Sequence, residues 1–359
     1  MLILKMNIFF KKFSFISLRW SFMNSGINCF YRYFAPLEHF KLKYSLLMNL
    51  KLIYVIFFIS IFRSHAQNDT VQNPYFKSYN DKITASVYYL DTSNSFQIAS
   101  DNQDPKIYLN LIPNRREQIG FNLNYKIIDV TIGFAPKFLS QNKGDSHSKH
   151  FNFNTRFYYK KWMQSFTFIN QKGFYISDEN ITAQLPRMRT TKIGGSTSYV
   201  FNDKFSFKTL VSQNEWQTKS SGSFIPSFSF YYTNLDLNSP DSSPADIYVF
   251  TLAPAYFYNF VISNRVLIGA GLALGAGIND IDGETSALYQ ADFNLKLAYN
   301  RDRFFGFASL NTIGFAQDDK VDPRLNDNIA TVKLSVGYRF DPPKKVKEVY
   351  DNVNKKIGL

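Results

Sequence analysis

Hydrophobic and polar positions alternate without a break in residues 330–340. In this segment, ATVKLSVGYRF, every even-numbered position is Ala, Val, Leu, Tyr or Phe, and every odd-numbered position is Thr, Lys, Ser, Gly or Arg. A period of two residues predicts a strand and not a helix. The pattern recurs along most of the chain, most clearly in a hairpin of residues 119–126 and 128–135 and in residues 286–300. Strands with one apolar face and one small or charged face are typical of a barrel that turns its apolar side to lipid.

The alternating segments together predict an all-β fold. We expect one transmembrane antiparallel β-barrel of about 12–14 strands over residues 82–340, with short turns and no plug domain. The alternative is a secreted soluble β-sandwich, which would hide its aromatic faces inside and show fewer and shorter strands. The candidate strands are 82–89, 106–111, 119–126, 128–135, 149–159, 161–171, 187–201, 204–216, 223–234, 246–259, 264–277, 286–300, 303–315 and 328–340.

Composition favours strands over helices as the elements that cross the membrane. Aromatic residues make up 18% of the chain, with 37 Phe and 23 Tyr, while the mean hydropathy is only −0.23. A helical membrane protein shows runs of about 20 apolar residues, and the sequence has none beyond residue 66. Aromatic girdles at the two membrane interfaces of a barrel account for many rings without long apolar runs.

Residues 48–66, MNLKLIYVIFFISIFRSHA, have the order of a signal peptide. Lys51 supplies a positive charge, an apolar run follows, and Ser64-His65-Ala66 places small residues before a cut ahead of Gln67. A membrane anchor is the alternative, but the apolar run is too short to span comfortably. We therefore expect Met48 to be the true start and residues 1–47 to be a mis-called extension.

The remaining boundaries follow from this start. Residues 67–81 are polar and are expected to form a periplasmic lead-in, and residues 341–359 are expected to form a charged periplasmic tail.

The formal net charge of +13 falls to +5 for residues 67–359, which contain 32 basic and 27 acidic residues. A nucleic-acid partner therefore loses most of its support. The single Cys29 also lies upstream, so the mature chain is expected to have neither an internal disulfide nor a cysteine for a lipid anchor.

Several segments resemble one family of uncharacterised proteins. They are IYLNLIPNRREQIGFNLNYKIIDVTIGF (107–134), QKGFYI (171–176), FSFKTLVSQNEWQTKSSGSF (205–224) and VGYRF (336–340). These pieces resemble the domain-of-unknown-function family numbered 4421 of Bacteroidota over roughly residues 75–340. Ser221 departs from the pattern, where a small Ala is expected beside the glycine. The resemblance implies an outer-membrane barrel, and it supplies no activity and no catalytic residue.

Polar side chains on the faces turned away from lipid form the candidate site. The densest run of hydrogen-bonding side chains begins at Gln213 and either lines a ligand site or constriction or forms a network that fills the barrel, and we favour the structural interpretation. Charges predicted to face inward are mostly basic, which favours anions if the lumen is open. The residues assigned to this lumen cluster are Gln213, Glu215, Gln217, Lys219, Ser220, Arg265, Lys296, Lys333 and Arg339.

Other chemistry has weaker support in the sequence. Asp145, His147 and His150 resemble part of a surface metal site, but a fourth ligand is not in view and a polar loop is the simpler interpretation. Asp129 and Asp292 would be an acid pair of the glycosidase kind, although each more readily balances a basic residue of the lumen. We therefore predict no catalytic residue, cofactor or metal.

The leading functional hypothesis is an outer-membrane pore or small-solute binder with a polar, mostly basic lumen. A non-conducting structural or assembly barrel is the alternative, and an outer-membrane hydrolase is the least favoured. The expected partners are outer-membrane lipid, the barrel-assembly machinery during biogenesis, and other envelope proteins through residues 341–359. We expect no nucleic-acid partner, and the expected location is the bacterial outer membrane.

Overall fold

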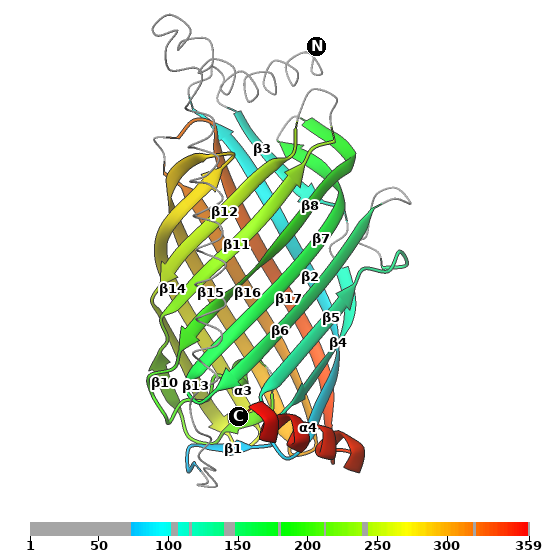
Figure 1. The fold of residues 1–359 in the computed structure, drawn as a ribbon, viewed down its shortest axis with the longest axis vertical. Helices are drawn as coiled ribbons and strands as arrows, with labels where there is room; N and C mark the ends of the chain where they lie inside the picture. Colours follow the sequence, from blue (N-terminus) through cyan, green and yellow to red (C-terminus); the bar gives the residue numbers. More distant parts are fainter. Residues whose placement is uncertain are drawn as a thin grey trace, which may run out of the picture. The chain divides into compact units, whose positions relative to one another are not determined.

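The computed structural model describes residues 73–101, 107–114, 117–139, 148–178, 181–211, 213–238, 243–318 and 321–357. The expected extension and signal peptide, residues 1–66, lie outside the described residues. Most of the described chain is antiparallel strand (Figure 1). The strands are β1 (Phe76–Ser78), β2 (Ile83–Ser100), β3 (Ile107–Pro113), β4 (Glu117–Tyr125), β5 (Ile128–Phe134), β6 (Lys149–Tyr159), β7 (Trp162–Asp178), β8 (Ile181–Tyr199), β9 (Glu215–Gln217), β10 (Ser221–Phe224), β11 (Ser227–Asp236), β12 (Ala245–Ala253), β13 (Ala255–Ser263), β14 (Val266–Ile281), β15 (Glu284–Arg301), β16 (Phe304–Gln317) and β17 (Arg324–Phe340), and the helices are α3 (Lys208–Val211) and α4 (Lys344–Ile357).

Twelve of these strands form a closed ring. The order is β14-β12-β11-β8-β7-β6-β5-β4-β2-β17-β16-β15, and β15 pairs back to β14. The shorter β10 precedes β11 across Pro226, and β13 follows β12 across Pro254, because proline lacks the N–H that a ladder needs. Closure leaves none of the twelve ring strands as a free edge strand. The prediction of an all-β antiparallel barrel is confirmed, with a strand count at the lower end of the expected range.

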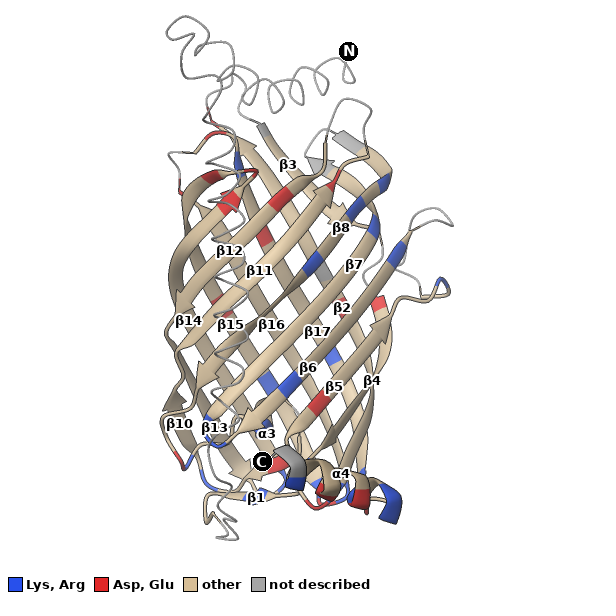
Figure 2. Ribbon diagram, viewed as in Figure 1, with Lys and Arg blue, Asp and Glu red and all other residues tan. Residues whose placement is uncertain are grey.

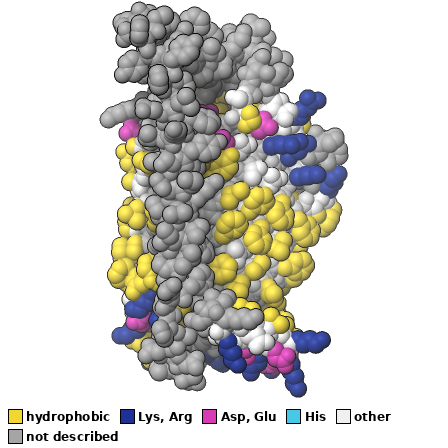
Figure 3. All heavy atoms as spheres, viewed as in Figure 1, with side chains coloured by type: hydrophobic (Ala, Val, Ile, Leu, Met, Phe, Trp, Pro, Cys, Tyr) yellow, Lys and Arg dark blue, Asp and Glu magenta, His cyan; other side chains and the backbone are white. Residues whose placement is uncertain are grey.

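The outer surface of the wall is apolar, as the alternation predicts. On β17 the side chains of Val332, Leu334, Val336 and Tyr338 are 46–52% exposed, whereas Arg339 on the other face is 0% exposed. Figure 3 shows hydrophobic side chains over the middle of the visible wall, and the same band is mainly uncharged in Figure 2. An apolar band bounded by charged residues is the outer surface that a lipid bilayer requires.

The strands are long enough to span a membrane. β15 has 18 residues and β17 has 17, while about 9–11 residues cross a bilayer at barrel tilt. The first wall strand begins and the last wall strand ends at the same end of the barrel, where Ile83 pairs with Phe340. We call this the terminal end and the opposite one the loop end. The expected closure of the last strand onto the first is therefore confirmed.

The wall is narrower at the loop end. There β3 pairs directly with β7 as well as with β2, whereas β4, β5 and β6 lie between β2 and β7 nearer the terminal end. The pairing of β7 with β8 shifts its register between Lys172 and Phe174. Gly173 lies at this shift, and its φ of 87° is in the region that favours glycine.

One predicted strand, residues 204–216, is wrong. These residues lie in the connection between β8 and β10 and contain α3 and the start of β9. The connection, residues 200–220, folds back into the terminal end of the barrel, and we call it the plug segment. β9 pairs with β1, so residues 73–81, which were expected to be only a lead-in, take part in the same structure.

The residues after Asp341 belong to a second compact unit, which contains α4. None of the helices in the described part of the chain is long and apolar enough to cross a membrane.

Candidate functional site

The plug segment is a buried polar structure held by its own side chains. Gln213, Asn214 and Gln217 are all 0% exposed. Ser206 lies two residues before α3, and its hydroxyl accepts a hydrogen bond from the N–H of Thr209 (3.1 Å) and donates one to the Glu215 carboxylate (2.6 Å). This is how serine commonly satisfies a free N–H at the start of a helix. The predicted run of hydrogen-bonding residues therefore folds on itself and does not lie in the wall.

Arg339 joins the plug segment to the last wall strand. Its Nε and Nη2 donate to the Gln213 carbonyl at 3.1 and 2.5 Å, and its Nη1 donates to Asn300 Oδ1 at 2.7 Å and to the Asp302 carbonyl. The guanidinium also lies over the Tyr79 ring, 3.9 Å from its centroid. A fully buried guanidinium is tolerated only when several acceptors surround it. Arg339 therefore fixes the plug segment to β17.

Lys296 on β15 makes a second connection of the same kind. Its ammonium donates to the carbonyls of Thr209 (3.3 Å) and Leu210 (2.5 Å) in α3, and lies 3.8 Å from the centroid of the Phe307 ring. Carbonyl groups at the end of a helix have few partners within the helix and favour a cation. Both buried cations thus bind carbonyl oxygens of the plug segment.

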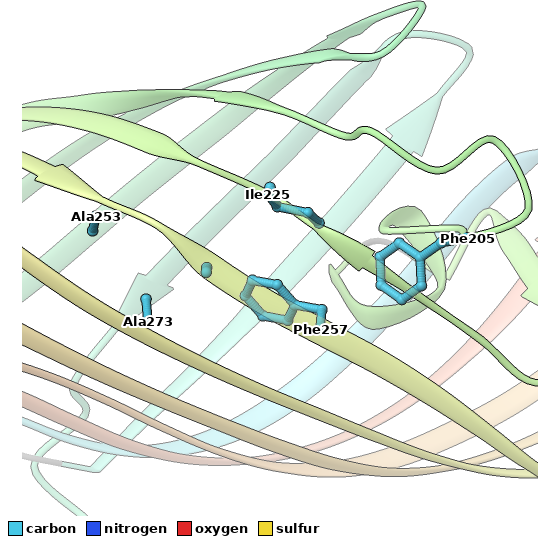
Figure 4. Close-up of a cluster of buried hydrophobic side chains, with 6 residues drawn as sticks. Phe205, Ile225, Ala253, Phe257 and Ala273 are labelled. Atoms are coloured by element: carbon cyan, nitrogen blue, oxygen red, sulfur yellow. The ribbon is translucent and has the colours of Figure 1, made fainter.

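Apolar contacts complete the attachment to the wall. Phe205 of the plug segment packs with Ile225, Ala253, Phe257 and Ala273, as Figure 4 shows. The small residues of the wall leave room here: a Cβ added to Gly269 of β14 would lie 2.0 Å from a side-chain carbon of Leu210. Gly269 therefore marks close packing of the wall against the plug segment.

The plug segment reaches across the lumen. Lys208 lies over the Tyr158 ring of β6, 5.2 Å from its centroid, while α3 contacts Lys296 of β15. In the ring order β6 and β15 are six strands apart, which places them on opposite sides of the barrel. Asn259 of β13 also donates to the Ser206 carbonyl (3.0 Å). The plug segment therefore contacts facing walls of the barrel at the terminal end.

The covering strand pair β1–β9 adds contacts at this end. Trp216 is 2% exposed and its indole N–H donates to the Asn264 carbonyl in the β13–β14 turn (3.1 Å). Lys77 on β1 donates to Asp302 Oδ1 at 2.6 Å in the β15–β16 turn. This hydrogen bond lowers the pKa of the Asp302 carboxyl from its usual value. The pair of short strands therefore attaches to two separate turns of the wall.

Beyond the plug segment, the lumen contains a cavity of about 360 Å³, which we call the chamber. Its lining is rich in Asn, Ser and Thr side chains from many wall strands. Members of the lining are Thr131, Asn152, Asn154, Ser165, Thr167, Ser196, Ser227, Asn294, Ser309, Asn311 and Thr331. Small neutral hydrogen-bonding groups of this kind favour a polar solute or water.

The charged groups around the chamber are mostly basic. Arg156, Lys296 and Lys333 line it together with one carboxylate, Asp292, whose oxygens accept hydrogen bonds from Gln290 at 2.8 and 3.0 Å. Arg156 has a carboxylate partner outside the lining residues, at 3.5 Å. The Lys333 ammonium lies 4.0 Å from the centroid of the Tyr88 ring, and in the described chain no carboxylate is within ion-pair distance of it. The lining of the chamber thus holds three basic side chains and one carboxylate.

A constriction lies toward the loop end. Lys192 is 1% exposed and forms an ion pair with Asp327 across the lumen. The rings of Phe96, Tyr231 and Phe315 surround its ammonium, with centroids 5.6–6.0 Å away. Alternation does not reveal this group, because its members come from distant strands. The available signal is that Lys192 shares its strand face with Thr190, Ser196 and Ser198.

The structure brings together most, but not all, of the predicted lumen cluster. Gln213, Glu215, Gln217, Lys296 and Arg339 lie in or against the plug segment, and Lys333 lies in the chamber. The other three predicted residues are exposed at the terminal end and do not line the lumen: Lys219, Ser220 and Arg265. Arg265 falls in the tight β13–β14 turn, and the plug segment leaves the barrel interior before Lys219. The predicted strand phase does not extend into these connections.

The structure describes one of the three residues that were considered as a metal site. His150 is buried and both its ring nitrogens are within hydrogen-bond distance of the Gln118 amide nitrogen (3.1 and 3.4 Å). Asp145 and His147 lie outside the described residues. In the part of the chain that the structure describes, no group of three or more metal-ligating side chains occurs.

The comparisons with solved structures give weak likenesses to other barrels. The COG4313 outer membrane channel from Pseudomonas putida F1 is 12% identical, and the match covers 77% of this chain and 100% of that chain with a TM-score of 0.38. The β domain of the Bordetella autotransporter Brka is 9% identical, with 72% and 100% covered and a TM-score of 0.37. OmpT of Vibrio cholerae is 9% identical, with 74% and 100% covered and a TM-score of 0.29. We draw no functional conclusion from likenesses at this level.

The sequence comparison is decisive for the family. No curated protein matches the sequence. The family model described as "Domain of unknown function (DUF4421)" matches residues 67–340, which is most of the chain and includes every wall strand. The expected resemblance is therefore confirmed, and the chain belongs to the DUF4421 family of β-barrel proteins.

Proposed function

We propose that this protein is an outer-membrane channel for small polar solutes, with a preference for anions, that rests with its terminal end closed. The terminal end faces the periplasm and the loop end faces the exterior. The observation that carries the proposal is the chamber of about 360 Å³, whose charged lining residues are mostly basic, behind a plug segment that lies inside the lumen. A barrel that served only as a scaffold would need neither an unfilled chamber nor a loop folded into its lumen.

The plug segment is suited to move without damage to the wall. It connects the end of β8 to the start of β10, and the wall pairs β8–β11 and β10–β13 lie outside it. Two of its attachments to the wall are hydrogen bonds from Arg339 and Lys296 to main-chain carbonyls. Water can replace these bonds at a modest net cost, since hydrogen bonds exchange with solvent on opening. An open state therefore keeps the ring intact.

Anion preference follows from the charges of the chamber. Lys333 lies there without a carboxylate partner in the described chain, and Lys296 gains freedom when α3 leaves. Positive side chains along a narrow polar path attract anions and repel cations. We propose a permeation path and not a catalytic site. The two carboxylates considered as an acid pair have separate hydrogen-bond partners: Asp129 accepts from Asn122 (3.1 Å), and Asp292 accepts from Gln290.

Conductance in planar bilayers tests the proposal. The wild type is compared with a variant in which residues 204–219 are replaced by a Gly/Ser linker. We expect rare openings for the wild type and a steady conductance for the variant, with a reversal potential in a salt gradient that indicates anion selectivity. Adding Lys333→Gln to the variant should weaken that selectivity. A linker variant that migrates on a gel as a folded barrel and yet never conducts would overturn the channel.

A non-conducting structural barrel is the second candidate. It is favoured by the complete burial of Gln213, Asn214 and Gln217, which resembles a permanent core. The linker variant separates the two candidates, because a permanent core should not be removable without loss of folding.

The processing of the N-terminus belongs to the same proposal. We propose that residues 48–66 are a cleaved signal peptide and that the mature protein begins at Gln67. Peptide mapping of the purified protein should find no residue before Gln67, and a retained tryptic peptide from residues 12–43 would contradict both the start and the signal assignment.

A further inference from the structure

The helix α4 has one apolar face. Its 14 residues are KKVKEVYDNVNKKI, with Val346, Val349 and Val353 spaced by three and four residues. Residues at this spacing lie on one side of a helix. Their side chains are 40%, 63% and 46% exposed. Moving three exposed valine side chains out of water is favourable, so this face of α4 is suited to bind an apolar surface.

The rest of α4 is polar and basic. The helix contains five lysines against one Glu and one Asp. Glu348, Asp351 and Lys355 lie on the side opposite the valines, while Lys345 and Lys347 lie at the borders of the apolar stripe. Lysines at the borders of an apolar face can place their carbon chains along lipid and their ammonium groups among headgroups. A basic amphipathic helix with this distribution is suited to a membrane interface carrying negative charge.

The connection to the barrel keeps this helix near a membrane. Three residues separate Phe340, the last residue of β17, from Lys344, so their Cα atoms lie within about 14 Å of each other. Tyr338 and Phe340 are 46% and 37% exposed on the lipid-facing side of that strand. Aromatic side chains in this position mark the membrane interface of a barrel. Headgroups are therefore within reach of α4.

We propose that α4 binds the anionic phospholipid surface of the membrane leaflet at the terminal end, with its valine face among the acyl chains and its lysines among the headgroups. The proposal differs from the earlier expectation that residues 341–359 contact envelope proteins. It does not depend on whether the barrel conducts, since it rests on the pattern of α4 and on its short connection to the lipid-facing end of β17.

Site-specific fluorescence in nanodiscs tests this proposal on the full-length protein. Residues 67–359 contain no cysteine, so a single cysteine carrying the polarity-sensitive dye NBD is introduced by Val349→Cys on the apolar face or by Asp351→Cys on the polar face. In discs containing phosphatidylglycerol, we expect a blue-shifted emission at position 349 that lipids with a spin-label quencher reduce. Position 351 should show neither effect, and it serves as the matched control on the same helix.

Two further experiments test whether anionic lipid causes the blue shift at position 349. Lys344→Gln, Lys345→Gln and Lys347→Gln together, or discs of phosphatidylcholine alone, should remove the blue shift at position 349. Equal emission at positions 349 and 351 would overturn the proposal. So would a blue shift at position 349 that the lipid quencher leaves unchanged, because a protein surface would then cover the valines. A shift that persists in phosphatidylcholine discs would overturn the assignment to anionic lipid.

Discussion

Replacing Arg339 by Met should open the terminal end of the barrel. Met fills much of the same space but cannot donate to the Gln213 carbonyl, which now accepts from two guanidinium nitrogens. A hydrogen bond to a charged group contributes about 1.5–3 kcal/mol. Because both bonds share one acceptor, we take about 3 kcal/mol for the attachment. A tenfold change in an equilibrium needs about 1.4 kcal/mol, so the ratio of open to closed channels should rise roughly a hundredfold.

The bonds that Arg339 makes to the wall require a control. Asn300 and the Asp302 carbonyl lose the same donor whether the plug segment is in or out, so this loss lowers stability and does not change gating. Arg339→Lys keeps the charge but not the forked geometry, and it should give an intermediate open probability. Single-channel recording gives the open probability, and migration of unboiled samples on gels confirms folding. Folded Arg339→Met protein with the open probability of the wild type would refute the role of this residue in closing the channel.

Other substitutions test the remaining parts of the account. Gly269→Leu should also raise the open probability, since even its Cβ would lie 2.0 Å from a side-chain carbon of α3, whereas Gly314→Ala, whose added Cβ has its nearest contact at 3.8 Å, should leave conductance unchanged. The double change Tyr338→Asp and Phe340→Asp places charge on the lipid face, where an acidic residue costs less than the about 2–4 kcal/mol of a lysine or arginine at the bilayer midplane, and less again near the interface. It should abolish membrane insertion in a protease-protection assay. Deletion of residues 341–359 should leave folding largely intact, as judged by the same gel shift. Tolerance of the double change together with failure of the deletion would contradict the assignment of the closing strand.

The lipid-facing surface could be predicted from the sequence because it depends on local alternation. Strand β15 shows this most clearly: Phe293, Leu295 and Leu297 are exposed, while Lys296 between them is 3% exposed. A one-residue error in phase would have placed every one of these side chains on the wrong side. Which side chains of a strand face lipid can therefore be predicted from that segment alone.

The plug segment could not be predicted in the same way. Phe205 and Phe207 are separated by one polar residue, as in a wall strand, but they pack on the inner surface of the wall and not on lipid. Alternation reports that one side of a segment is apolar, and it does not distinguish a lumen contact from a lipid contact. The four-residue helix α3 is too short for a helical period to appear.

The contact partners of the inward-facing side chains across the lumen could not be predicted from the sequence either. The sequence correctly suggested that Lys296 and Arg339 face inward, yet their acceptors are main-chain carbonyls of a segment far away in the chain. The pair Lys192–Asp327 likewise joins strands that are remote in sequence. Such contacts depend on the diameter and register of the ring, which no local pattern specifies.

The most direct test of the closed state is the accessibility of the chamber from the terminal end. Ser309 lines the chamber, and because residues 67–359 contain no cysteine, Ser309→Cys provides a single thiol there. A membrane-impermeant maleimide is added to the terminal side of the reconstituted barrel, in otherwise wild-type protein and with Arg339→Met added. The account predicts slow labelling in the first protein and much faster labelling in the second. Fast labelling in both would contradict the claim that residues 200–220 close the barrel.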